Sequence, residues 1–163
     1  MKNKIVYSKY VIAVTAIAYG IFFIGCILTL HDKPLFYTFL AAFLIAIITG
    51  LMFGPWYIRA DKDYVIAHSI LKSKKIPVRD IESIELFQPT MGAVRILGSG
   101  GFMGYWGMFK EGDIGRYRAF YGKASDCFLI RMKNGEKYVP GCETTNKMVE
   151  HIKSLLAALK SEN

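Results

Sequence analysis

The sequence is dominated by residues 34–57, PLFYTFLAAFLIAIITGLMFGPWY, which carry no charged side chain. An α-helix rises 1.5 Å per residue, so about 20 residues cross a hydrocarbon layer of ~30 Å. A buried helix of a soluble protein seldom has so long an uncharged run. The stretch therefore predicts a helix that spans a lipid bilayer.

A second uncharged run lies just upstream, at residues 11–30. Only His31, Asp32 and Lys33 separate the two runs, and so short a connection requires antiparallel neighbours. Pro34 suits the first turn of the second helix, where a missing N–H is tolerated. We expect residues 1–57 to form a membrane hairpin, and residues 58–163 to form a separate domain.

The distribution of charge predicts an orientation for this hairpin. Three lysines and no acidic residue precede the first run, whereas the tip carries one lysine balanced by Asp32. Further basic residues follow the second run, beginning with Arg59 and Lys62. By the positive-inside rule, both termini are expected in the cytoplasm of a multi-pass inner (plasma) membrane protein.

Small residues recur at every fourth position of the second run, a pattern that allows membrane helices to approach closely. The stripe consists of Ala42, Ala46, Gly50 and Gly54, and the first run offers Ala16 and Gly20. An antiparallel hairpin would place Ala16 opposite Gly50 and Gly20 opposite Ala46, which is the favoured interpretation. Homodimerisation through the same stripe and chance are the alternatives.

Residues 58–163 read as several short strands followed by one helix. Residues 115–121 and 127–133 alternate between apolar and charged side chains, which is typical of half-buried strands. Asn134-Gly135 predicts a type I′ hairpin turn. The last segment changes to a helical apolar stripe, made by Met148, Val149, Ile152, Leu155, Leu156 and Leu159. The predicted class is α+β: the hairpin, then a small bent sheet or half-open barrel closed by the C-terminal helix.

This order resembles the bacterial pleckstrin-homology-like (PH-like) domains that are tethered to a two-helix membrane hairpin. The resemblance covers essentially the whole chain. It rests on the hairpin, on residues 76–78 leading into 80–84, on the glycine run GSGGFMGYWG at 98–107, on Gly115-Arg116-Tyr117 and on the terminal helix. It implies a seven-stranded half-open barrel capped by the helix, and it implies no catalytic residues.

Motifs for chemistry are missing from the sequence. The glycine run lacks the Gly-Lys-Ser/Thr of a phosphate loop, so its glycines are expected to serve turns and twisted strands, and its aromatic residues could dip into the lipid surface. The three cysteines contain no CxxC pair, and neither a nucleophile elbow nor HExxH occurs. We expect no catalytic residue, no metal and no cofactor; an unrecognised membrane enzyme is the least favoured alternative.

Basic residues form the one candidate binding site. Four of them cluster near a predicted hairpin and two more lie on one strand face: Lys72, Lys74, Lys75 and Arg79, with Arg116 and Arg118. They could contact anionic lipid headgroups, or they could be solvated side chains on the cytoplasmic side. The net charge of +8 is too diffuse to indicate nucleic acid. The favoured function is a membrane-anchored, non-enzymatic scaffold that presents its domain to a protein partner or the membrane surface; the alternative is a sensor of anionic lipid or phosphate.

Overall fold

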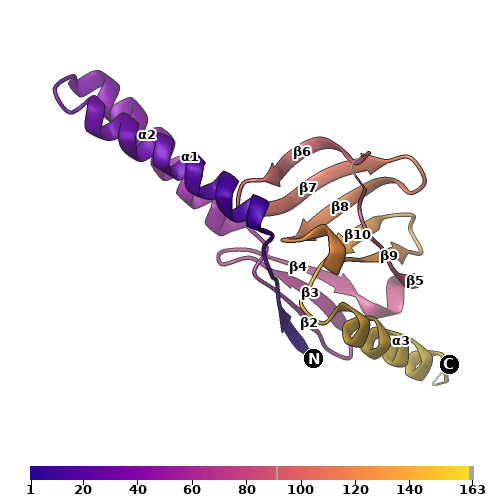
Figure 1. Cartoon of the computed structure of the whole chain (residues 1–163). Coiled ribbons are helices and arrows are strands. Elements are labelled where there is room, and N and C mark those ends of the chain that lie inside the picture. The colour runs from indigo at the N-terminus through magenta and orange to yellow at the C-terminus, as the bar shows by residue number, and fades with distance from the viewer. Residues whose placement is uncertain (91, 162–163) are drawn as a thin grey trace.

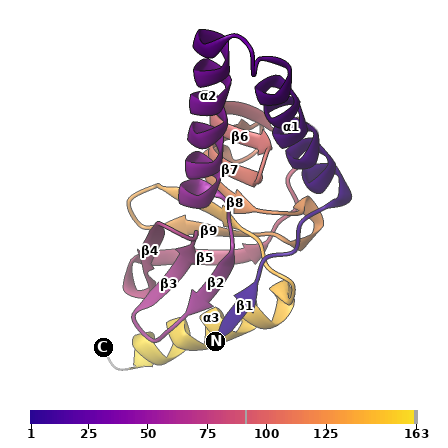
Figure 2. The same cartoon turned by 90° about the vertical axis from the view of Figure 1, so that its left-hand side faces the viewer.

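The computed structural model describes residues 1–90 and 92–161. Two long helices, α1 (Lys9–Leu28) and α2 (Lys33–Phe53), project from one end of a β domain, and a third helix, α3 (Thr145–Ser161), lies at the other end (Figure 1). The N-terminus and α3 lie at the end opposite the α1–α2 connection (Figure 2). The predicted α+β order is therefore confirmed.

Local sequence explains where α1 and α2 begin and end. The Ser8 hydroxyl and the Asp32 carboxylate accept hydrogen bonds from backbone N–H groups of the first turns, so each caps a helix. Pro34 lies in the first turn of α2, as predicted. The helix ends at Phe53, before Gly54-Pro55, so it is shorter than the uncharged stretch. Both helices are long and apolar enough to cross a membrane, judged by length and composition alone.

The contact between the two helices differs from the predicted one. A Cβ at Gly20 would meet no atom within 4 Å, and Ala16 is exposed. The Cβ of a residue at position 50 would instead lie 2.9 Å from Cγ of Met103, a residue of the β domain. The predicted pairs Ala16–Gly50 and Gly20–Ala46 are therefore wrong. The reason is that Met103 of the β domain and the Tyr19 hydroxyl of α1, rather than a small residue of α1, occupy the space beside Gly50.

Aromatic packing joins the two long helices. Tyr19 packs edge-on against Phe43 at 5.9 Å between ring centroids, and Phe22 stacks on Phe43 at 6.3 Å. A Cβ at Gly25 would lie 2.5 Å from the Phe39 ring, so the small residue that α1 needs is Gly25. On α2, Ala42 and Ala46 are half-buried.

The first sheet has four antiparallel strands in the order β1-β2-β3-β4. They are β1 (Lys2–Lys4), β2 (Tyr57–Ala60), β3 (Tyr64–His68) and β4 (Ser73–Pro77). Strand β1, which the sequence did not predict, precedes α1 yet pairs with β2, which follows α2. The N-terminus is thus part of the β domain, which we define as residues 1–5 and 57–161.

The second sheet has six strands in the order β5-β9-β10-β8-β7-β6, and its β10–β8 pair is parallel. They are β5 (Ile81–Leu86), β6 (Val94–Gly101), β7 (Gly104–Glu111), β8 (Gly115–Tyr121), β9 (Phe128–Met132) and β10 (Lys137–Pro140). Short 3₁₀ turns precede β5 (η1, Val78–Asp80) and β9 (η2, Ala124–Asp126). The described residues thus form sheets of four and six strands rather than the expected seven, and these do not close into a barrel.

The main core lies between the two sheets and α3. Met148, Val149 and Ile152 of α3 are buried in it, which confirms the predicted apolar stripe. A second apolar cluster covers the far face of the six-stranded sheet. Strand β9 is buried on both faces, because Phe128 and Ile130 enter the main core while Leu129 enters the second cluster.

The Asn134-Gly135 turn has a different type from the predicted one. A type I′ turn needs positive φ at both central residues. Among the described residues other than glycine, only Met103 has a positive φ, whereas Gly135 has φ 83°. The Gly135 N–H donates to the Met132 carbonyl at 2.9 Å, so the tight turn starts one residue earlier and Gly135 follows it as a bulge.

Candidate functional site: a cleft at the membrane-facing corner

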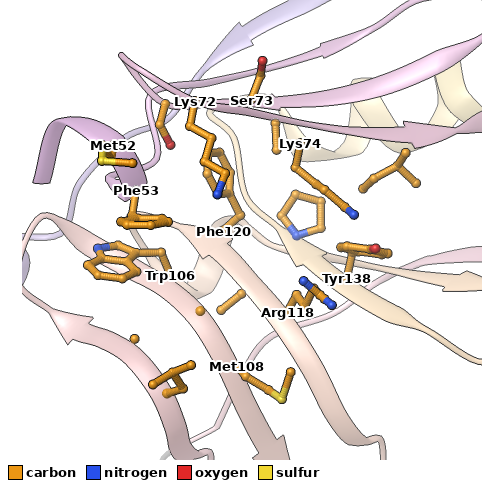
Figure 3. Close-up of a pocket in the computed structure, with 18 residues that line it drawn as sticks. Met52, Phe53, Lys72, Ser73, Lys74, Trp106, Met108, Arg118, Phe120 and Tyr138 are labelled. Carbon is orange, nitrogen blue, oxygen red and sulfur yellow. The ribbon is translucent and has the colours of Figure 1, made fainter. Parts of the chain in front are cut away.

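A cleft of about 620 Å³ lies between the two sheets at the end of α2 (Figure 3). Strands β3 and β4 of the first sheet, with the turn between them, form one wall, and strands β6, β7, β8 and β10 of the second sheet form the other. Met52 and Phe53, the last residues of α2, line the end nearest the helices. The cleft therefore occupies the corner that α3 leaves open.

Aromatic and other apolar side chains make most of the lining. Trp106 of β7 stacks on Phe53 with 5.1 Å between ring centroids and 18° between planes, and its indole N–H donates to the Phe102 carbonyl at 3.3 Å. Met108 and Phe120 are half-buried and continue this surface. Their packing places an apolar surface directly beside the end of α2.

A facing pair of glycines, Gly98 and Gly107, forms the part of the wall where β6 meets β7. Their φ angles are +114° and +109°, and a Cβ would lie 2.1 Å from the Trp106 carbonyl oxygen or 2.2 Å from that of Leu97. Only glycine permits this close approach of the two strands. The strand register also shifts between Arg95 and Leu97. The expected role of the glycine run in twisted and bulged strands is thus what the structure shows.

The tip of the β6–β7 hairpin lies against both long helices. The Met103 N–H donates to the Thr15 hydroxyl at 2.9 Å, and Phe102 packs edge-on against Tyr19 at 5.3 Å between centroids. Met103 also faces Gly50 and Gly54. The aromatic residues of the glycine run thus contact the helices.

Three cations line the cleft: Lys72, Lys74 and Arg118 (Figure 3). The Lys72 ammonium lies 5.1 Å from the centre of the Phe53 ring, and the Lys74 ammonium lies 5.6 Å from that of Tyr138. Arg118 comes from the opposite sheet and lies 3.7 Å from a Glu136 carboxylate oxygen. The fold thus gathers cations that are far apart in the sequence.

The other three predicted cations lie elsewhere. The Lys75 ammonium lies 5.9 Å from the centre of the Tyr64 ring, and Arg79 lies 3.9 Å from Asp80. Arg116 is exposed on β8 and is not part of the cleft lining. Lys75 differs from Lys74 because successive residues of a strand point to opposite faces.

One hydrogen bond at the cleft couples an acid to an aromatic hydroxyl. The Tyr138 hydroxyl donates to a Glu136 carboxylate oxygen at 2.7 Å. This bond lowers the pKa of Glu136, helped by the positive charges of Arg118 and Lys74. Burial, followed by the hydrogen bond and charge of Glu136, raises the pKa of Tyr138 to about 12. Both effects keep the carboxylate charged and the phenol neutral.

His68 of β3 is not among the residues that line the cleft. His68 stacks on Tyr57 at 4.4 Å between centroids, and burial together with Lys2, Arg59 and Lys75 lowers its pKa. Within residues 1–90 and 92–161, no three His, Cys, Asp or Glu side chains gather as metal ligands would.

Sequence reasoning missed the apolar half of the site: Phe53, Trp106, Met108, Phe120 and Tyr138. They come from α2 and three different strands, so no local pattern joins them. The one available signal was the mixture of glycine and aromatic residues at 98–107.

The comparisons with known proteins agree with this architecture. A family model described as "Bacterial PH domain" matches residues 56–156, which is more than half of the chain. No curated protein and no solved structure matches the chain. The chain therefore belongs to the bacterial PH domain family.

Proposed function

We propose that this protein is a membrane-tethered, non-enzymatic binding module that holds its PH-like domain at the cytoplasmic membrane surface. The observation that carries the proposal is the direct packing of the domain on its helices. Only Gly54, Pro55 and Trp56 separate α2 from β2, and Phe53 stacks on Trp106. The helices therefore hold the domain at a set position instead of serving as a flexible leash.

Exposed apolar side chains support the membrane assignment. Ile17 of α1 and Tyr37 and Ile45 of α2 are each more than 60% exposed, and such side chains occur around both helices. Soluble proteins rarely leave a continuous apolar surface of this extent in water. Lipid would cover it at no such cost.

The pairing of β1 with β2 supports the predicted orientation. Strand β1 precedes α1 and β2 follows α2, so both ends of the helical hairpin lie on the same side of any membrane that it crosses. The positive-inside rule then favours the cytoplasm for that side. The partner would be a second protein, another copy of this chain or the membrane surface itself.

Cysteine labelling in cells tests this proposal. His31→Cys lies at the hairpin tip and Lys153→Cys lies on α3. A membrane-impermeant maleimide should label only the first variant in intact spheroplasts and only the second in inverted vesicles. Labelling of Lys153→Cys from outside, or release of the full chain into solution without detergent, would overturn the proposal.

A sensor of anionic lipid or phosphate is the second candidate. It is favoured by one observation, the meeting of Lys72, Lys74 and Arg118 at one cleft. In that case the tryptophan fluorescence of the full chain should differ between vesicles of anionic lipid and vesicles of neutral lipid. Identical fluorescence in both would exclude the sensor.

A further inference from the structure

We propose that the cleft binds one anionic glycerophospholipid from the adjacent leaflet. Its acyl chain would lie against Trp106, Met108 and Phe120, and its phosphate would lie at Lys72, Lys74 and Arg118. This inference rests on the proposed membrane location and names the ligand that such a module would hold.

The size and chemistry of the cleft fit an amphiphile. Its volume of about 620 Å³ falls in the range of roughly 300–1,000 Å³ found for ligand pockets. Most of its lining is apolar, and its three cations are Lys72 and Lys74 on one wall and Arg118 on the other (Figure 3). A free phosphate would leave the apolar wall wet, and a neutral lipid would leave the cations without a counter-charge.

The position of the cleft explains how a lipid would reach it. Met52 and Phe53 end α2 and also line the cleft, so it lies where α2 would leave the bilayer. An acyl chain could therefore enter from the leaflet without crossing water. The stacked Phe53 and Trp106 rings would line the entrance through which the acyl chain passes from the membrane to the cleft.

The charge of the cleft favours an anionic headgroup. Among the described residues, Lys72 and Lys74 have no carboxylate oxygen within 4.0 Å, whereas Arg118 has Glu136 at 3.7 Å. These three cations and one acid leave an excess of two positive charges. Each basic side chain near an anionic group adds to the attraction, so the headgroup rather than the chain would decide which lipid binds.

Fluorescence quenching of Trp106 in the full-length chain tests the proposal. The chain has two tryptophans, so Trp56→Phe leaves Trp106 as the sole reporter. The probe is phosphatidylglycerol with brominated acyl chains, added to protein in neutral detergent, because bromine quenches only at short range. Quenching should saturate, and brominated phosphatidylcholine should require a roughly tenfold or higher concentration.

Two triple variants remove the same charge and differ only in position. Lys72→Gln with Lys74→Gln and Arg118→Gln should abolish the preference for phosphatidylglycerol, because all three line the cleft. Lys75→Gln with Arg79→Gln and Arg116→Gln should keep it, because these cations lie outside the lining. Equal quenching by both lipids in the parent chain, or equal loss in both triple variants, would overturn the inference.

Two further experiments distinguish a lipid from a soluble phosphate and identify the molecule that fills the cleft. Glycerol 3-phosphate carries the same phosphate without chains, and it should not displace the brominated lipid at equal concentration; full displacement would mean that the site reads a soluble phosphate. Native mass spectrometry should show one phosphatidylglycerol per chain, and a lipid-free dimer would mean that a second copy fills the cleft. None of these results depends on the maleimide labelling, so the two proposals can fail separately.

Discussion

The two sheets leave two corners between them, and the side chains at these corners are packed differently. At the far corner, Met148, Val149 and Ile152 of α3 are each at most 4% exposed. At the corner beside α2, Trp106 and Met108 stay half-buried around a cleft. We call the corner that α3 fills the closed corner and the corner that holds the cleft the open corner.

This difference separates stability from binding. Burial of apolar area stabilises a fold by about 25 cal/mol per Å², so an unfilled apolar corner forgoes stability that α3 supplies at the other one. The open corner also holds cations and two glycines at positive φ, features that do not serve core packing. We interpret the closed corner as the structural one and the open corner as the functional one.

The largest expected effect on the free energy of unfolding comes from shortening a side chain at the closed corner, and the matched change at the open corner should have a smaller effect. Ile152→Ala should lower the free energy of unfolding by about 2–5 kcal/mol, because Ile152 is completely buried. Met108→Ala should lower it by about 1 kcal/mol or less, because its side chain already borders the cleft. Guanidinium titration of the full chain in detergent, followed by tryptophan fluorescence, measures both. Equal losses would mean that the open corner is as tightly packed as the closed one.

The next effect concerns the helix that borders the open corner. Gly50→Leu should destabilise the chain by about 1–3 kcal/mol, because a Cβ there would lie 2.9 Å from Met103 and 3.2 Å from the Tyr19 hydroxyl. Gly20→Leu is the matched control, because a Cβ at Gly20 meets nothing within 4 Å.

Hydrogen exchange of the Met103 amide, which donates to the Thr15 hydroxyl at 2.9 Å, reports the contact without a further substitution. Its protection should fall in the Gly50→Leu variant and stay unchanged in the Gly20→Leu variant. The buried residues of α3 should keep their protection in both. Unchanged protection of the Met103 amide in Gly50→Leu would show that the hairpin tip does not depend on this glycine.

The stacking of Phe53 on Trp106 should give a smaller effect. A double-mutant cycle with Phe53→Leu and Trp106→Leu should show a coupling of about 0.5–1.5 kcal/mol, as found for aromatic pairs. Circular dichroism follows the unfolding, since Trp106 is itself replaced. A control cycle between Phe53 and the exposed Tyr64 should be additive within about 0.5 kcal/mol. Additivity in the first cycle as well would mean that α2 does not support the open corner.

The contrast between the corners also explains how far the sequence could lead. The closed corner was predictable, because the apolar stripe of α3 recurs at local helical spacing and has to be buried. Both long helices and the alternation along β8 were predictable for the same reason. Each of these depends on residues that are near neighbours in the chain.

The open corner was not predictable, because it depends on contacts between distant segments. Lys74 and Arg118 meet only through the fold, and β1 pairs with β2 across the whole helical hairpin. The small-residue stripe failed in the same way: its spacing was correct, but Met103 from another part of the chain takes the place beside Gly50. The spacing of small residues along a helix shows that these positions must be small, but it does not show which neighbouring residue requires it.

The smallest expected effect is a dependence on pH that belongs to the open corner. The hydrogen bond from Tyr138 lowers the pKa of Glu136 below its ordinary value of 4.5. The folded chain then binds fewer protons here than the unfolded chain, so this stabilisation is complete above pH 4.5 and is lost as the pH falls below it. The Glu136 side chain is 44% exposed and therefore screened by water, so the loss should be roughly a few tenths of a kcal/mol.

Tyr138→Phe removes the main cause of this shift and should reduce the loss of stability between pH 7 and pH 3. Glu136→Gln should abolish this part of it, whereas Glu82→Gln, an exposed acid on β5, should change it little. The free energies of unfolding in detergent at the two pH values provide the measurement. The buried α3 residues that fill the closed corner, Met148, Val149 and Ile152, have no titratable side chain. A Tyr138→Phe chain that loses as much stability as the parent would show that the open corner gains nothing from its ionised acid.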